Sequence, residues 1–104
     1  MNSQMKQMMA QAQKMQQNMM RMQEELADAR LEGTAAGGMV TAVVSGQGEL
    51  LSISISPEAV DPEDVEMLED MVLVAVRDAV EKSHELSREK MQGMGIPGGL
   101  GGML

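Results

Sequence analysis

The amino-acid sequence predicts an α+β fold, with a long N-terminal helix, a small antiparallel sheet and a C-terminal helix. Helix-forming residues without glycine or proline cover residues 1–31, short alternating apolar and polar runs lie within residues 32–56, and helical periodicity returns over residues 61–91. At 104 residues the chain has room for one domain. We place this domain, which we expect to dimerise, at residues 1–92.

The predicted N-terminal helix carries an apolar heptad pattern. Gln, Met, Lys, Glu, Ala and Leu dominate it, and all of them favour helix. At about 1.5 Å per residue it spans roughly 45 Å, which is more than a compact chain of this size can cover. Its apolar positions alternate in steps of three and four, as in a coiled coil. They are Met5, Met8, Ala12, Met15, Met19, Met22, Leu26 and Ala29.

This apolar stripe has two interpretations. The commoner role of such a stripe is packing against the chain's own sheet, but the helix is too long for that role alone. We therefore expect the stripe to divide between the sheet and a second copy of the chain. Leu26 and Ala29 are assigned to the sheet. The residues assigned to dimerisation are Met5, Met8, Met15, Met19 and Met22.

Two segments rich in Val, Ile and Ser, residues 39–45 and 49–56, predict strands. In the second segment Leu51, Ile53 and Ile55 alternate with serines, which predicts one buried and one solvent-facing side. The glycine-containing linker between the strands suits a hairpin turn, and residues 32–36 allow a third, weaker strand. A strand follows the linker's two glycines, so they do not predict a nucleotide loop.

Asp61 and Pro62 predict the start of the second helix, as its N-cap and its first helical residue. Residues 71–76 taken alone also match a strand, but the length of the pattern and the cap favour helix. Residues 93–104 are rich in glycine and uncharged, which predicts a disordered tail. The helix face expected to pack on the sheet consists of Val65, Leu68, Val72, Ala75, Ala79 and Val80.

Charge is distributed unevenly along this chain of net charge −8. Residues 1–23 contain three bases and no acid, whereas residues 57–70 contain seven acids and no base. The three bases, Lys6, Lys14 and Arg21, fall within about 80° of one another on the side of the helix away from the apolar stripe. The first helix therefore has one face for pairing and one basic face that suits phosphate groups.

The composition excludes most catalytic chemistry. The chain has no cysteine, so it has no disulfide, thiolate nucleophile or sulfur-ligated zinc. His84 is its only histidine, and it has no aromatic residue on which bases can stack. We predict a protein that is not an enzyme and has no cofactor, metal or small-molecule substrate.

Two polar clusters keep two interpretations each. The acids of residues 58–70 fit a metal or carboxylate site, or helix capping and solvation, and capping explains most clusters of this kind. Arg77, His84 and Arg88 share one helix face, which fits a ligand-facing surface or a solvated face equally well. We expect His84 to be exposed.

The chain contains no run of about 18 apolar residues and does not begin with a signal-peptide pattern. These features predict a cytoplasmic protein that makes no contact with a membrane.

Three segments resemble the YbaB/EbfC family of nucleoid-associated proteins. They are MKQMMAQAQKMQQNMMRMQEEL near the start, GGMVTAVVSGQGELLSISISPE in the middle, and EMLEDMVLVAVRDAVEKSHE followed by REKM near the end. The resemblance implies an α-β-β-β-α subunit, a tweezer-like homodimer, and DNA binding with limited sequence specificity in the nucleoid. Carried onto this chain, the family's basic helix positions fall on Lys6, Lys14, Arg21, Lys82, Arg88 and Lys90.

Two functions follow as hypotheses. In the first, a homodimer binds duplex DNA through phosphate contacts, bridges or compacts it, and affects gene expression. In the second, which the methionine-rich surface and negative net charge favour, the chain is a protein-interaction module for replication or recombination machinery with little direct DNA binding.

Overall fold

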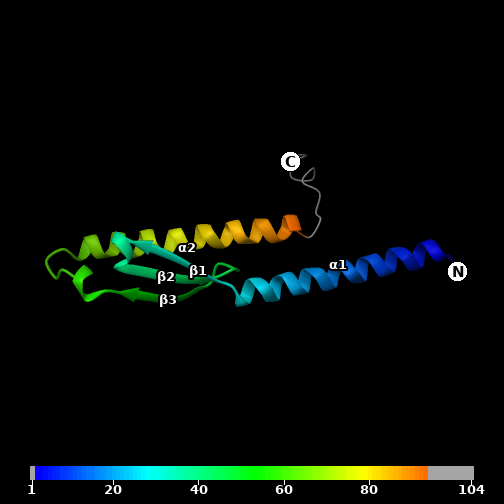
Figure 1. Cartoon of the computed structure of the whole chain (residues 1–104), viewed down its shortest axis with the longest axis horizontal. Helices are drawn as coiled ribbons and strands as arrows, with labels where there is room; N and C mark the ends of the chain where they lie inside the picture. Colours follow the sequence, from blue (N-terminus) through cyan, green and yellow to red (C-terminus); the bar gives the residue numbers. More distant parts are fainter. Residues whose placement is uncertain (1, 94–104) are drawn as a thin grey trace.

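The computed structural model describes residues 2–93, and its elements follow the predicted α-β-β-β-α order. Figure 1 shows the first helix leaving one end of the sheet and extending past the second helix, in a chain that measures 75 × 27 × 17 Å. The predicted tail, apart from Gly93, lies outside the described residues. The elements are α1 (Ser3–Asp28), β1 (Arg30–Ala35), the 3₁₀ turn η1 (Ala36–Gly38), β2 (Val40–Ser45), β3 (Leu50–Ile55), the 3₁₀ turn η2 (Pro57–Ala59) and α2 (Val65–Gly93).

The sheet is antiparallel with β2 in the centre. The predicted third strand is a full one, because β1 pairs with β2 along all six of its residues. A tight turn joins β2 to β3, as the linker predicted. In this turn the Ser45 hydroxyl accepts hydrogen bonds from the backbone N–H groups of Gln47 and Glu49, and Gly48 has a φ of 86°.

Small residues form the contact between α2 and the sheet. Ala75 and Ala79 of α2 are fully buried against Gly33 of β1, which pairs with Ala42 of β2. A Cβ atom on Gly33 would collide with the carbonyl oxygen of Ala75 and the backbone nitrogen of Ala79. The helix backbone therefore approaches the strand backbone only because position 33 has no side chain.

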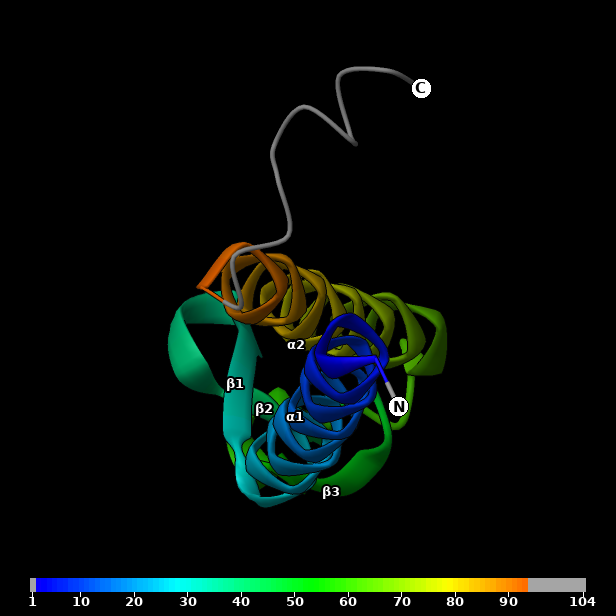
Figure 2. The same cartoon turned by 90° about the vertical axis from the view of Figure 1, so that its right-hand side faces the viewer.

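The helix α2 covers only part of the sheet. It packs on β1 and β2 and has little contact with β3. Figure 2 shows β3 at the edge of the sheet that lies farther from α2. Ile53 and Ile55 pair with Ala42 and Val40, so they face the same side of the sheet as α2. They are nevertheless 41% and 39% exposed.

The prediction that the apolar side of residues 49–56 is buried is therefore wrong for a single chain. Every residue of β3 is exposed, including Leu51, which lies at a break in the register between β2 and β3. The alternation correctly indicated which side chains share a face. It could not indicate that α2 stops short of that face.

The first helix ends earlier than predicted. We expected it to reach residue 31, but it ends at Asp28, and the next residues pair with β2 as Arg30 opposite Ser45 and Leu31 opposite Val44. Hydrogen bonds of the sheet thus override the helix preference of these residues. Arg30 also donates from Nη1 to the carbonyl oxygens of Ala27 and Ala29, both at 3.0 Å, and so caps the helix end.

The second helix begins later than predicted. Asp61 and Pro62 belong to a turn, in which the Asp61 carboxylate accepts from the N–H of Glu63 at 3.0 Å. The helix begins at Val65, and the Asp64 carboxylate accepts from the N–H of Met67 at 3.2 Å, as an N-cap does. It continues to Gly93, two residues past the predicted end.

The face that we expected α2 to pack on the sheet is largely confirmed. Ala75 and Ala79 are fully buried, and Leu68, Val72 and Val80 are half-buried against the core. Val65 is the exception, because it stands at the first turn, beyond the sheet, and is exposed.

Substitution of Gly33 tests the close helix–sheet contact. We expect Gly33→Ala to lower the free energy of unfolding by about 3 kcal/mol, because the added methyl group has no space between the two backbones. Urea unfolding followed by circular dichroism measures this change. The control is Gly93→Ala, where a Cβ atom meets nothing within 4 Å and which should change stability by less than about 1 kcal/mol. Equal effects of the two substitutions would contradict the proposed packing.

Candidate nucleic-acid interface

The N-terminal part of α1 projects from the body of the molecule, and we name residues 3–23 the arm. The Asn2 side chain caps the helix by accepting from the N–H of Gln4 at 3.1 Å. Leu26 is the only fully buried residue of α1, and it lies beyond the arm, next to the sheet. The side chains of the arm are therefore largely open to solvent.

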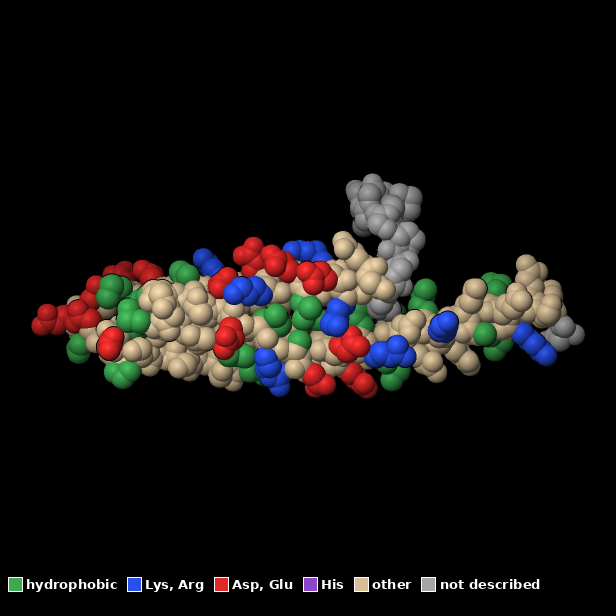
Figure 3. Space-filling model, viewed as in Figure 1, with side chains coloured by type: hydrophobic (Ala, Val, Ile, Leu, Met, Phe, Trp, Pro, Cys, Tyr) green, Lys and Arg blue, Asp and Glu red, His purple; other side chains and the backbone are tan. Residues whose placement is uncertain are grey.

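The arm carries basic side chains and no acidic ones. Lys6, Lys14 and Arg21 are all exposed, and within residues 2–93 none of them forms an ion pair. Figure 3 shows blue side chains along the projecting helix, whereas red side chains gather on the body and at its opposite end. The positive charge of the arm is thus available to an external anion.

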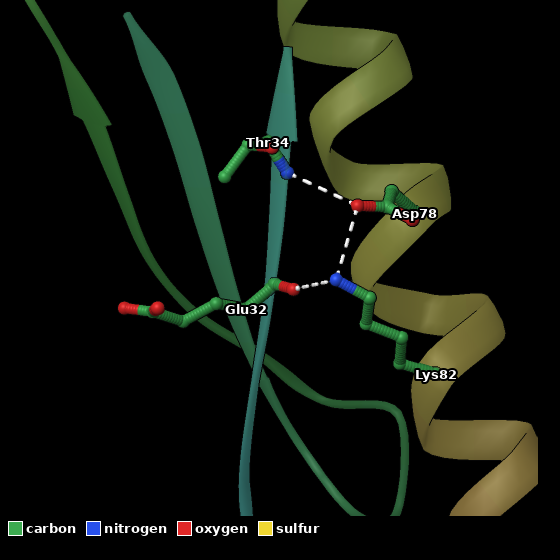
Figure 4. Close-up of polar contacts among 4 residues, drawn as sticks. All are labelled: Glu32, Thr34, Asp78 and Lys82. Carbon is green, nitrogen blue, oxygen red and sulfur yellow. Dashed lines mark hydrogen bonds and ion pairs between the residues drawn. The ribbon is translucent and has the colours of Figure 1, made fainter. Parts of the chain in front are cut away.

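The basic residues of α2 are placed differently from those of the arm. Lys82 donates from Nζ to the carbonyl oxygen of Glu32 at 2.8 Å and lies 3.4 Å from the Asp78 carboxylate. Asp78 in turn accepts from the N–H of Thr34 at 3.2 Å, as Figure 4 shows. Asp78 and Lys82 thus hydrogen-bond to backbone groups on the outer edge of β1. Backbone N–H and C=O groups left unpaired at a sheet edge can pair with a strand of another chain.

Lys90 is also engaged within the chain. Its Nζ atom lies 2.7 Å from Oε2 of Glu25, and this contact joins the end of α2 to α1. The pair stands beside a cleft of about 510 Å³ between the two helices, lined also by Arg21 and Leu86. Of the three predicted α2 contacts, only Arg88 is both exposed and outside the ion pairs of the described residues.

The ion pair between Glu25 and Lys90 changes the titration of the acid. The hydrogen bond from Lys90 and the charge of Lys90 lower the pKa of Glu25 below 4.5, with a smaller contribution from Arg21. Desolvation opposes this shift without reversing it. The contact therefore holds through neutral pH and is lost as the pH falls through the lowered pKa.

Three further contacts fix the direction of α1 at its root. Gly46 donates its N–H to the Leu26 carbonyl at 2.7 Å, and Gln47 donates from Nε2 to the Gln23 carbonyl at 3.3 Å. Arg30 caps the helix end as described above. The predictions from the sequence did not include these residues. A base next to a helix end is a recognised capping signal for Arg30, whereas nothing in the sequence indicated the contacts of the turn.

The methionines predicted for dimerisation form an open stripe, which we name the methionine seam. Met5, Met8, Met15 and Met19 are exposed, and Met22 is half-buried. Met15, Met19, Met22 and Met91 line an apolar groove of about 330 Å³ beside the end of α2. Within one chain, the described residues leave this groove open.

The remaining polar candidates show no assembled site among the described residues. No group of three or more acidic or histidine side chains is arranged to hold a metal ion in residues 2–93. His84 is exposed, as expected, and so are Arg77 and Arg88 on the same helix face. None of the described helices combines the length and the apolar character needed to cross a membrane.

The fold and the arm together define a class of small α+β proteins with a projecting helix that presents basic side chains and, through residue 23, no acidic ones. The chain belongs to the YbaB/EbfC DNA-binding family, whose family model matches residues 1–100. This is a family of nucleoid-associated DNA-binding proteins, not a family of enzymes.

Individual relatives are similar over nearly the whole chain. A nucleoid-associated protein of Saccharopolyspora erythraea is 56% identical over 98 residues, which cover 94% of this chain and 83% of that protein. One from Chloroflexus aurantiacus is 51% identical over 98 residues, with coverage of 94% and 96%. The crystal structure of the uncharacterized protein HP0035 from Helicobacter pylori has a similar fold, with a TM-score of 0.75 at 22% identity, covering 86% of this chain and 94% of that one.

The contact between Glu25 and Lys90 predicts a pH-dependent arm. Because the chain has no cysteine, spin labels can be placed at Gln16→Cys and His84→Cys to measure the separation of the two helices. We expect one narrow distance distribution from pH 7 to 5 and a broader, longer one as the pH falls below the lowered pKa of Glu25.

Glu25→Gln should give the broad distribution already at pH 7. The matched control is Glu24→Gln, since Glu24 is exposed and outside the ion pairs of the described residues. An arm that stays ordered in Glu25→Gln would show that the ion pair does not position it.

Proposed function

We propose that this chain is a nucleoid-associated protein that binds duplex DNA mainly through phosphate contacts of the arm. The observation that supports it best is the set of three exposed bases, Lys6, Lys14 and Arg21, on a helix segment without acids. Each is outside the ion pairs of the described residues, so binding DNA breaks none of those ion pairs. The DNA-binding family to which the chain belongs supports the same ligand.

The chemistry of the arm favours binding with limited sequence specificity. Lysine and arginine side chains neutralise phosphates and release counterions, which gives affinity without reading base sequence. The chain has no aromatic residue to stack on bases. Any preference among sequences would come from the shape and deformability of the duplex.

The α2 bases take a secondary part in this proposal. Arg88 is exposed and can reach a phosphate directly. Lys82 and Lys90 would have to leave Asp78 and Glu25, so each of them adds less to DNA affinity than a lysine of the arm.

The proposed protein works as a homodimer, and the open side of β3 supports this part of the proposal. Ile53 and Ile55 are exposed there, next to a flank of α2 that carries Leu73, Val76 and Val80. That flank lies opposite Asp78 and Lys82, which reach β1, so it points toward β3. An open strand edge beside an apolar flank is typical of a surface that a second chain covers.

The methionine seam supports the same assembly from the other end of the molecule. Coiled-coil spacing and exposure suit pairing with the α1 helix of the partner. A dimer then presents two arms, and two arms that each bind duplex can bridge or compact DNA and so affect gene expression. The relatives named as nucleoid-associated proteins support a location on the nucleoid, in the cytoplasm.

The salt dependence of DNA binding tests the role of the arm. If the six bases of two arms contact phosphates, the logarithm of affinity should fall with the logarithm of salt concentration at a slope of about −5. The variant Lys6→Gln, Lys14→Gln, Arg21→Gln should flatten this slope and weaken binding more than about tenfold at about 50 mM salt. Fluorescence anisotropy with a labelled duplex measures both quantities.

A charge-preserving variant, Lys6→Arg, Lys14→Arg, Arg21→Lys, serves as the control and should keep the slope. An unchanged slope in the glutamine variant would remove the arm from the interface. Absence of binding by the unaltered chain at about 50 mM salt would instead favour a protein-interaction module. The exposed methionines are compatible with that second function.

Substitutions on β3 test the proposed dimer. We expect Ile53→Lys with Ile55→Lys to reduce the mass in solution from about 22 kDa to the 11.2 kDa of one chain, because buried lysines would be unpaired at the interface. The matched control is Ser52→Lys with Ser54→Lys, on the opposite face of the same strand. Light scattering measures the mass, and a dimer that persists in the isoleucine variant would contradict this interface.

A further inference from the structure

One flank of α2 carries exposed apolar side chains for which the proposed function has no use. Met67 and Val74 are 45% and 54% exposed, and they lie about three turns and about one turn before Asp78, on the same side of the helix. Asp78 reaches the outer edge of β1. Met67 and Val74 therefore point past β1, away from the β3 side where we place the dimer, and none of the described elements lies beyond β1.

The same flank is acidic. Asp70, Glu81 and Glu85 share it and are exposed, and within residues 2–93 none of them forms an ion pair. The exposed bases Arg77 and Arg88 stand at the outer margin of this flank, beside Asp70 by helical spacing. The three carboxylates still leave the surface around Met67 and Val74 acidic overall, which suits an amphipathic helix that carries bases. We name it the acidic flank.

The arm has a surface of the matching kind. Met9 and Met20 lie outside the methionine seam and are 61% and 58% exposed. By helical spacing they stand between the seam and the basic side of the helix, next to Lys6, Lys14 and Arg21. The arm thus presents exposed methionines next to bases, whereas the acidic flank presents Met67 and Val74 next to acids.

We propose that the arm of one copy docks on the acidic flank of another copy. Apolar side chains meet apolar side chains and bases meet carboxylates, which is the complementarity that specifies a partner. Within residues 2–93 of one chain this contact is not made, because the arm extends away from the body and past the end of α2 (Figure 1). Since two different surfaces meet, the contact is heterologous and repeats from copy to copy.

This docking uses the same bases as the proposed contact with DNA. An arm held on an acidic flank is not available to phosphates, so duplex and a second copy compete for it. This competition rests on the proposed DNA contact, and the two-chain baseline of the test below rests on the proposed dimer; the docking itself stands on the two protein surfaces. Without DNA, the arms are then bound to the acidic flanks of other copies in short assemblies. Duplex DNA dissociates these assemblies by binding the arms.

Light scattering of the full chain without DNA tests the docking. At about 20 mM salt, where charges act over about 20 Å, we expect a mass that rises with concentration to more than about twice the two-chain value. At about 500 mM salt it should return to two chains. A mass that stays at two chains at low salt would overturn the proposal, whatever the DNA-binding result.

Two charge-reversal variants identify the surfaces. One has an acidic arm, with Lys6→Glu, Lys14→Glu and Arg21→Glu, and the other has a basic flank, with Asp70→Lys, Glu81→Lys and Glu85→Lys. Each alone should remain at two chains. A mixture should assemble again, because acidic arms meet basic flanks and basic arms meet acidic flanks.

The control variant reverses three acids outside α2, with Glu32→Lys, Glu49→Lys and Glu58→Lys, and should assemble like the unaltered chain. Loss of assembly in this control would assign the effect to net charge and overturn the proposal. Failure of the mixture to assemble, with both variants folded by circular dichroism, would also overturn it. The uncharged variant Met67→Gln, Val74→Gln should weaken assembly, and an unchanged mass would exclude the apolar part of the contact.

Discussion

The close contact between Gly33 and the alanines of α2 is the constraint on which the other features of this protein depend. Because Ala75 and Ala79 lie directly on the β1 backbone, α2 is centred over β1 and β2 and has little contact with β3. The same position brings Asp78 and Lys82 to the outer edge of β1. The close approach of α2 to the backbone of Gly33 thus decides that α2 contacts the β1 edge of the sheet and leaves the β3 edge uncovered.

The charges of the molecule divide into those used within the chain and those left for partners. Lys82 and Lys90 position secondary structure, the first at the edge of β1 and the second between α2 and α1. The bases of the arm form no ion pair among the described residues. A chain of net charge −8 can therefore still be a candidate for binding a polyanion, because three of its bases stand on a projecting helix segment that contains no acid.

Local sequence patterns predicted the order of elements and the projecting helix, because heptad spacing, alternation and turn residues act over a few positions. They predicted less well what depends on distant segments. Nothing near Lys90 in the sequence indicates a contact with Glu25, and nothing near Asp61 indicates that Asp64 caps the helix instead. For Ile53 the alternation identified its face, but burial of that face requires a covering element that the described residues of one chain do not supply.

The root of α1 has a mechanical consequence. The helix is 26 residues long, or about 39 Å, and is fastened to the body only near Leu26, Arg30 and Lys90. It therefore behaves as a lever, and a rotation of about 10° at the root moves its tip by about 7 Å, or roughly two phosphate spacings along one DNA strand. The position of the helix tip is thus set by a few hydrogen bonds roughly 30 Å away, at the other end of the arm.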